Sequence, residues 1–250
     1  MSDHKVYKVA ISVPNEAYIL PDSYENHTLL AFHMGKLEGQ WEKENRPIQY
    51  EFNRYTTGRL MTAMAREQLV KTALLDGMDY ILMIDSDMIC PINMVEWLLE
   101  DVEKNPEIDI LAPLAFMRNP PHYAVIYTTT EGYDQENHQA YFVNNFVKNY
   151  PKDTLVECDA VGFGAVLIKM DVVRKMKAPY FFSTTGSGED IYFCMKARQE
   201  ADARVFMDTR VKLGHIGKNI IIDEEYRDKY IADNKEDLPD VPQKYLTETR

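Results

Sequence analysis

Apolar residues in the first half of the chain alternate between short continuous runs and segments with helical spacing. Such runs are typical of strands that are buried on both faces, and they predict strands over residues 7–13, 49–53, 80–84 and 108–112. Helical spacing between the runs predicts helices over residues 24–36, 59–76 and 93–104. This alternation, with short connections, predicts an α/β fold: a Rossmann-like, mostly parallel sheet flanked by helices.

The helix expected over residues 59–76 has the clearest apolar face, formed by Leu60, Met61, Met64, Leu69, Ala73 and Leu74. The second half has a different pattern, with paired strands at 123–129 and 139–146, a glycine-interrupted strand at 161–168 and a helix at 190–201. It adds a small antiparallel β region to the sheet. We expect residues 1–218 to form one catalytic domain and residues 219–250 to form an acidic helix or arm packed on it.

Charge and composition narrow the possible partners. The chain of 250 residues has 28 Lys and Arg against 40 Asp and Glu, a net charge of −12. Binding to nucleic acid is therefore disfavoured. A local basic groove could still be formed by Arg54, Arg59, Lys148 and Lys152. The three cysteines lack CxxC spacing, and the N-terminus has no signal-peptide pattern, so we expect a cytoplasmic protein. The absence of a long apolar run predicts that no segment spans a membrane.

Asp85-Ser86-Asp87 directly follows the apolar run at 80–84, where the carboxyl end of a strand would place it at the ligand-binding edge of the sheet. Two neighbouring carboxylates repel each other, and a hard divalent cation that binds oxygen ligands would relieve this repulsion. The alternative is that both aspartates only stabilise a turn or cap the next helix.

Three further motifs carry candidate chemistry. Glu189-Asp190 begins a predicted helix, where the helix dipole keeps a carboxylate ionised and able to act as a general base, or where it merely stabilises the helix. His215 lies between glycines, which predicts an exposed tight turn, and its imidazole could complete an aspartate-rich site for manganese. Gly162-Phe163-Gly164 interrupts a strand, as expected of a bulge or of a close backbone approach to a ligand.

In this order, the four motifs resemble the landmarks of GT-A glycosyltransferases: the DxD motif, the glycine-rich acceptor loop, the xED motif and the C-terminal histidine. The resemblance covers about residues 6–217. Ala65-Arg66 is also similar to an Ala-Arg pair in bacterial and bacteriophage, family-2-like members. The resemblance to GT-A glycosyltransferases implies transfer of a sugar from a UDP- or GDP-sugar to an acceptor hydroxyl, with Mn²⁺ or Mg²⁺ at the diphosphate.

The resemblance also implies a role for each residue. Asp85, Asp87 and His215 would hold the metal, and Asp190 would be the base of an inverting reaction, with Glu189 the less favoured base. The donor would contact Pro14, Asn15, Arg66, Asp85 and Ser86, and the acceptor would lie on Gly162, Phe163 and Gly164. Tyr180, Phe181 and Phe182 are candidates to stack on the sugar faces of the acceptor.

Three alternatives remain open at this point. A nucleotidyltransferase uses a related sheet and metal carboxylates, but the sequence after Val13 lacks the glycine-rich, basic segment that grips a triphosphate. A glycosyltransferase acting on modified nucleic-acid bases is a second alternative. A non-catalytic binding protein that keeps the fold is a third.

Overall fold

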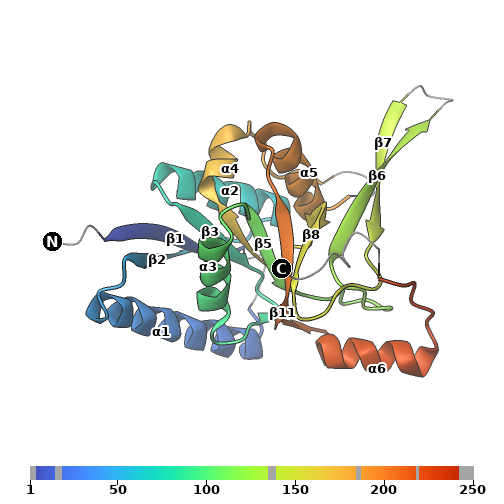
Figure 1. Ribbon diagram of the computed structural model, residues 1–250, viewed down its shortest axis with the longest axis horizontal. Helices are drawn as coiled ribbons and strands as arrows, with labels where there is room; N and C mark the ends of the chain where they lie inside the picture. The colour runs from blue at the N-terminus through green and yellow to red at the C-terminus, as the bar shows by residue number, and fades with distance from the viewer. Residues whose placement is uncertain (1–3, 15–18, 135–138, 184–186, 218–219, 242–250) are drawn as a thin grey trace.

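A seven-stranded sheet with the order β2-β1-β3-β10-β5-β11-β8 forms the centre of the computed structural model, which describes residues 4–14, 19–134, 139–183, 187–217 and 220–241 (Figure 1). Strands β1, β2, β3, β5 and β11 run in one direction, and β8 and β10 run in the opposite direction. The mostly parallel α/β fold predicted from the sequence is therefore confirmed. The strands are β1 (Lys5–Val13), β2 (Ile48–Thr56), β3 (Tyr80–Ile84), β5 (Ile110–Leu114), β8 (Leu155–Cys158), β10 (Ala165–Lys169) and β11 (Val205–Lys212).

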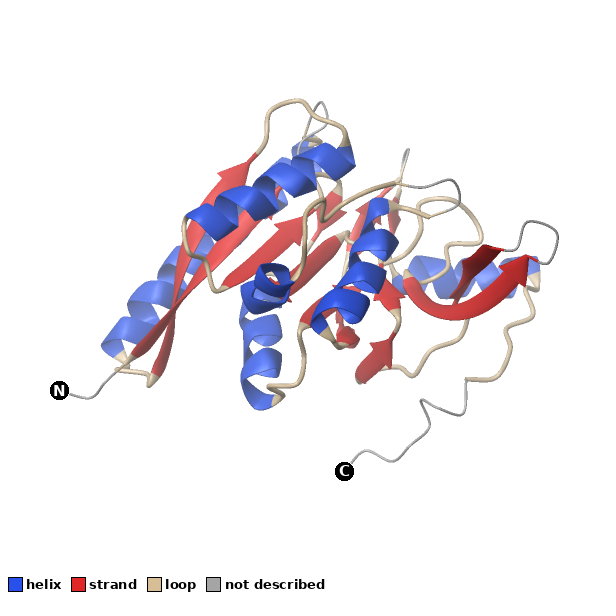
Figure 2. Cartoon of the chain, turned by 90° about the horizontal axis from the view of Figure 1, so that it is seen from above, coloured by secondary structure: helices blue, strands red, loops and turns tan. Residues whose placement is uncertain are grey.

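Helices cover both faces of this sheet (Figure 2). One face packs on α2 (Thr62–Leu75), α4 (Met170–Lys175) and α5 (Glu189–Ala201). The other face packs on α1 (Pro21–Lys43) and α3 (Met94–Lys104). The central strands are thus buried on both sides, which explains why β3 and β5 are continuous apolar runs.

Two small sheets lie beside the main one. The first has the order β13-β12-β4 and consists of β4 (Met88–Ile89), β12 (Gly214–Ile216) and β13 (Ile221–Ile222). The second has the order β7-β6-β9 and consists of β6 (Ile126–Asp134), β7 (Gln139–Phe146) and β9 (Ala160–Val161), and its β6–β7 hairpin projects from the body of the protein (Figure 1). This hairpin confirms the expected antiparallel region.

The sequence misplaced the inner face of α2. The helix begins at Thr62 rather than near residue 59, and the side chains of Met61 and Met64 are 71% and 54% exposed. Leu69 and Ala73 are buried as predicted, and Ala65, Arg66 and Val70 complete the buried face. The apolar pattern failed here because an arginine occupies one of the inward positions.

The expected strand at 161–168 is also divided, because β9 and β10 belong to different sheets. The chain leaves β9 at Gly162, whose backbone N–H donates to the carbonyl oxygen of Val125 at 2.9 Å. A Cβ atom at Gly162 would lie only 2.7 Å from the Cβ of Val125. The close approach foreseen at this glycine is therefore to a neighbouring valine.

The C-terminal segment forms α6 (Glu224–Asn234), which begins with a side-chain cap: Asp223 Oδ1 accepts a hydrogen bond from the backbone N–H of Tyr226 at 2.9 Å. Tyr150 donates to Glu224 Oε1 at 3.0 Å, and Arg227 Nη2 donates to the carbonyl of Lys148 at 2.7 Å. These bonds fasten α6 to the chain that follows β7. In the described part of the protein, no helix is long and apolar enough to cross a bilayer.

Candidate active site

The DxD segment forms a turn at the carboxyl edge of the main sheet. The backbone N–H of Asp85 donates to the carbonyl of Gly164 at 2.8 Å, and that of Met88 donates to the carbonyl of Asp85 at 3.2 Å. The backbone N–H of Ile216 donates to the carbonyl of Asp87 at 2.9 Å. Three of the four sequence motifs are thus joined by backbone hydrogen bonds.

Arg66 connects the DxD turn to the fourth motif. Its side chain is 3% exposed, and Nη2 donates to Asp85 Oδ1 and Oδ2 at 2.7 and 2.9 Å. Nη1 donates to Glu189 Oε1, and Nη2 also reaches the carbonyl of Phe163 at 3.1 Å. We expected Arg66 to contact the nucleotide, but its guanidinium is occupied inside the protein, where it ties α2, β3, the glycine loop and α5 together.

Burial governs the ionisation of Asp85. It raises the pKa of this carboxyl to about 6, against the opposing effect of the Arg66 charge. The neighbouring carboxylates of Asp87 and Glu189 act in the same direction as burial. Asp85 therefore depends on Arg66 to stay ionised near neutral pH.

Asp87 and His215 form a pair beside the turn. His215 Nε2 lies 3.3 Å from Asp87 Oδ2, and His215 Nδ1 lies 2.8 Å from the carbonyl oxygen of Phe116. Burial opposes ionisation of Asp87, but the hydrogen bond and charge of His215 and the charge of Arg118 lower its pKa below the ordinary value. Burial likewise opposes protonation of His215, but Asp87 and the Phe116 carbonyl raise its pKa.

His215 is not in an exposed turn, as its flanking glycines suggested. It lies on β12, with its side chain 20% exposed, and pairs with Met88 of β4. The strand fixes the ring, and we assign the Nδ1 proton to the bond with Phe116, so that Nε2 is directed toward Asp87. The glycine at 214 is needed because a Cβ there would lie 2.5 Å from the side chain of Ile221.

We tested whether these residues fit a divalent cation. Asp87 Oδ2 and His215 Nε2 lie 3.3 Å apart, and a pair of one oxygen and one nitrogen donor suits manganese. Asp85 is bonded to Arg66, and among the described residues no three His, Cys, Asp or Glu side chains form a ready-made metal site. These two residues therefore fit only a cation that would take its remaining ligands from water or from a bound ligand with oxygen donors, as magnesium commonly does.

Sequence reasoning missed Arg118, which lies beyond the end of β5. Its guanidinium forms an ion pair with Asp87, and Nη2 also lies 3.4 Å from His215 Nε2. Nothing in the motifs pointed to it. Its position just after a buried strand was the available signal, since side chains at the carboxyl ends of strands share one edge of the sheet.

Asp190 and Glu189 occupy the first turn of α5 in different environments. Glu189 is bonded to Arg66, whereas Asp190 forms no ion pair with any other described residue. Asp190 Oδ1 accepts a hydrogen bond from the backbone N–H of Ile191 at 2.8 Å. Burial raises the pKa of Asp190, and the charge of Arg66 partly opposes this shift. A carboxylate in this state suits proton transfer better than its paired neighbour does.

The aromatic side chains near the glycine loop form core rather than surface. Phe163, Phe181 and Phe193 pack together, with the rings of Phe181 and Phe193 stacked at 4.8 Å. Tyr180 and Phe181 are buried, so the expectation that both stack on an acceptor sugar is wrong. Phe182 is exposed and stays a candidate.

The remaining candidate residues lie at the same edge or outside the described residues. Pro14 is buried at the end of β1, and Ser86 is partly buried within the DxD turn. Asn15 lies outside the described residues. A Cβ on Gly164 would lie 3.0 Å from the terminal methyl of Met88, so this glycine lets the loop pack on the DxD turn.

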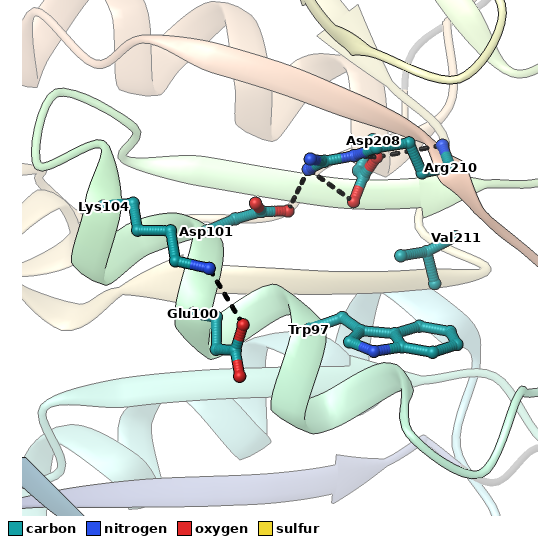
Figure 3. A pocket seen from close by; sticks show the side chains of 7 residues that line it. All are labelled: Trp97, Glu100, Asp101, Lys104, Asp208, Arg210 and Val211. Carbon is teal, nitrogen blue, oxygen red and sulfur yellow. Dashed lines mark hydrogen bonds and ion pairs between the residues drawn. The ribbon is translucent and has the colours of Figure 1, made fainter.

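A separate pocket of about 250 Å³ lies between α3 and β11 (Figure 3). Arg210 Nη2 bonds Asp101 Oδ2 at 2.6 Å, and Arg210 Nε bonds Asp208 Oδ1 at 2.8 Å. Burial raises the pKa of Asp101 to about 6. Lys104 pairs with Glu100 at 3.0 Å. All five charged side chains are paired within the pocket, and we assign no chemistry to it.

Comparison with known proteins places the fold but not the family. The structure of A197 from STIV matches with a TM-score of 0.53 at 16% identity, covering 88% of this chain and 91% of that one. Apo UDP-glucose pyrophosphorylase matches with a TM-score of 0.50 at 10% identity, covering 92% and 98%. S. aureus TarS has a TM-score of 0.41 at 14% identity, covering 86% and 59%. No family model and no curated protein matches the sequence.

Proposed function

We propose that the protein is a metal-dependent glycosyltransferase that moves a sugar from a UDP- or GDP-sugar to an acceptor hydroxyl. One observation carries the proposal: Asp87 and Asp190 are next to the two carboxylates that Arg66 binds, Asp85 and Glu189, but have different surroundings from each other. Asp87 is paired with His215 Nε2, which suits a cation and a diphosphate. Asp190 has no ion pair among the described residues, which suits a base.

The donor side of the reaction would use Asp87 and His215. These residues would hold Mn²⁺ or Mg²⁺, which stabilises the negative charge that develops on the leaving diphosphate. Asp85 would have a different role from the one that the DxD pattern suggests, because Arg66 holds both of its oxygens. It would fix the turn so that Asp87 keeps its orientation.

The acceptor side would use Asp190. Its carboxylate would accept the proton of the acceptor hydroxyl while the hydroxyl oxygen forms a bond to the anomeric carbon. The bond from that carbon to the diphosphate breaks at the same time, and its electron pair leaves with the diphosphate. Attack from the side opposite the leaving group inverts the configuration. Glu189 is a weaker candidate because Arg66 already binds it.

A nucleotidyltransferase is the second candidate, and the fold shared with UDP-glucose pyrophosphorylase favours it. That reaction would release pyrophosphate, whereas glycosyl transfer releases a nucleoside diphosphate. The sequence from Val13 to Tyr18 contains neither glycine nor a basic residue to bind a triphosphate. We therefore prefer glycosyl transfer.

The test measures release of nucleoside diphosphate from a panel of UDP- and GDP-sugars, with Mn²⁺, Mg²⁺ or a chelator. We expect metal-dependent release from one donor, and its loss in Asp87→Ala. Asp171→Ala is the matched control, because Asp171 is an exposed aspartate whose ion-pair partner within the described residues is Arg174. Release of pyrophosphate from a nucleoside triphosphate and a sugar phosphate would favour the second candidate. Full activity of Asp87→Ala would refute the metal assignment.

A further inference from the structure

Each aspartate of the DxD segment is bonded to its own arginine, and the two arginines differ in exposure. Arg66 is 3% exposed and is held by Asp85, Glu189 and the carbonyl of Phe163. Arg118 is 53% exposed and contacts Asp87 and His215. Arg66 is a fixed part of the core, whereas the guanidinium of Arg118 can leave Asp87 without opening a cavity.

Arg118 also lies against both candidate metal-ligand atoms, Asp87 Oδ2 and His215 Nε2. Its Nη2 atom bonds Asp87 Oδ2 and lies 3.4 Å from His215 Nε2, and those two ligand atoms are 3.3 Å apart. A guanidinium and a divalent cation cannot both be bound there. Any cation that takes Asp87 and His215 must therefore displace Arg118.

A short hairpin presents Arg118 to the site. Phe116 and Ala124 form an isolated bridge, and the backbone N–H of Met117 donates to the carbonyl of Tyr123 at 3.0 Å. Within the hairpin, His122 Nδ1 donates to the carbonyl of Met117 at 3.0 Å. The carbonyl of Phe116 binds His215, so the hairpin holds both Arg118 and the metal-directed histidine.

The C-terminal helix clamps this hairpin. The buried ring of His122 lies between two tyrosines of α6, at 5.4 Å from the ring of Tyr226 and 5.0 Å from that of Tyr230, with edge-on geometry to both. Such aromatic contacts each add about 0.5–1.5 kcal/mol beyond burial. Helix α6 thereby sets the position from which Arg118 reaches Asp87.

We propose that Arg118 is an exchangeable counter-ion of the site, positioned by His122 and α6, and that a divalent cation bound to a diphosphate displaces it from Asp87. The inference rests on the proposed function for the identity of the diphosphate. Once displaced, the guanidinium is free to bind the diphosphate oxygens, for which its planar donors are well suited. The cation and the diphosphate then bind with positive coupling, because the diphosphate gives Arg118 a new partner.

The test measures binding of Mn²⁺ alone, by the electron paramagnetic resonance of free Mn²⁺, and binding of inorganic pyrophosphate to the Mn²⁺-loaded protein. We expect Arg118→Ala to bind Mn²⁺ alone about 5- to 150-fold more tightly than the native protein, the usual range of coupling between sites. The same variant should bind pyrophosphate more weakly. Arg118→Lys, which keeps the charge, should stay closer to the native protein in both measurements.

Arg204→Ala is the matched control. Arg204 is also an exposed arginine paired with a carboxylate, Glu157, and its loss changes the net charge by the same amount. It should leave Mn²⁺ binding unchanged. Equal or weaker Mn²⁺ binding by Arg118→Ala than by Arg204→Ala would overturn the proposal, as would the absence of Mn²⁺ binding to both.

A second variant tests the clamp. His122 has a left-handed backbone, φ 56°, and asparagine accepts this conformation, so His122→Asn removes the ring between the two tyrosines with little backbone cost. We expect it to strengthen Mn²⁺ binding in the native background and to have no further effect in Arg118→Ala. An equal effect in both backgrounds would show that His122 acts without Arg118 and would overturn the positioning role.

These measurements need no turnover, so they separate the two proposals. Tighter Mn²⁺ binding by Arg118→Ala in a protein that releases no nucleoside diphosphate from any donor would support the exchange and refute glycosyl transfer. Metal-dependent release of nucleoside diphosphate, with Mn²⁺ affinity unchanged by Arg118→Ala, would support glycosyl transfer and refute the exchange of Arg118.

Discussion

Arg66 Nη2 lies 2.7 and 2.9 Å from the two carboxylate oxygens of Asp85, although the residues belong to different elements, α2 and the turn after β3. The same guanidinium binds Glu189 at the start of α5. One buried cation therefore holds together the donor and acceptor sides of the proposed site. Its loss would leave two carboxylates without their counter-charge.

Arg66→Ala should lower the free energy of unfolding by about 3–5 kcal/mol, because breaking a buried ion pair leaves an uncompensated charge. Arg66→Lys should recover only part of this loss, since lysine cannot donate to three acceptors in the same fork geometry. Urea unfolding measures both. Arg204→Ala, an exposed control, should cost about 0–1 kcal/mol. An equal cost for Arg66→Ala and Arg204→Ala would contradict the structural role of Arg66.

Asp190→Asn should reduce kcat by about 10²- to 10⁴-fold, the usual contribution of a general base, while the donor still binds. Glu189→Gln should reduce kcat less, because Glu189 is bonded to Arg66 and the amide can keep that hydrogen bond. Single-turnover kinetics with a bound donor separates binding from transfer. The assignment of the base is wrong if Glu189→Gln is the more damaging change.

The rate should fall as the pH is lowered through the pKa of Asp190. Burial raises the pKa of Asp190 above its ordinary value of 3.8, and a base must be unprotonated, so kcat/KM should rise with pH through this raised pKa. The effect on stability has the opposite sign. Between the unfolded and the folded pKa the folded chain binds more protons, so this group's contribution to stability falls as pH rises. Measuring kcat/KM against pH tests this rise. The rise should be absent from the residual activity of Asp190→Asn.

Gly162→Ala should destabilise the protein by about 1–3 kcal/mol, the usual cost of overpacking a core. The added Cβ would lie 2.7 Å from Cβ and 2.9 Å from Cγ2 of Val125. Gly35→Ala in α1 is the control, because a Cβ there meets nothing within 4 Å, and alanine should stabilise the helix by about 0.5–1 kcal/mol. Denaturant midpoints for both variants test the pair. A neutral Gly162→Ala would mean that the loop can move away from Val125.

The cysteines should resist alkylation in the native protein. Cys90, Cys158 and Cys194 are free and buried, and burial raises the pKa of both Cys90 and Cys194 to about 12. Few thiolates therefore exist near neutral pH, and reagents cannot reach them. Iodoacetamide labelling followed by mass spectrometry should show modification only after unfolding in urea. Rapid labelling of the native protein would contradict this burial.

The sequence predicted well those features that depend on one element at a time. The run at 80–84 became β3 with the same bounds, and the helix predicted at 190–201 became α5. Asp85 and Asp87 follow β3 directly, as the sequence predicted. Strand β11 was missed, because Asp208, Thr209 and Arg210 interrupt its apolar pattern. Asp208 is buried and paired with the exposed Arg210, and the buried Thr209 hydroxyl donates to the carbonyl of Thr154 at 2.8 Å.

Features that depend on contacts between distant segments were not predictable from these patterns. The partners of Arg66 lie after β3 and on α5, so its role becomes visible only when these elements are placed beside α2. Arg118 has no motif, and its contact with Asp87 depends on a hairpin that α6 holds from the far end of the chain. Hydrophobic periodicity records burial against a core, and it contains no information about which charges meet.

The two arginines also have a kinetic consequence. Asp85 and Glu189 share the guanidinium of Arg66, and Asp87 is bonded to Arg118, so two positive charges offset most of the negative charge of these three carboxylates. Repulsion of an anionic donor therefore comes mostly from distant charges, which salt screens over about 8–10 Å. The encounter of a nucleotide sugar with this protein should become faster as ionic strength rises, the reverse of the dependence found for proteins that attract their ligands over long distances.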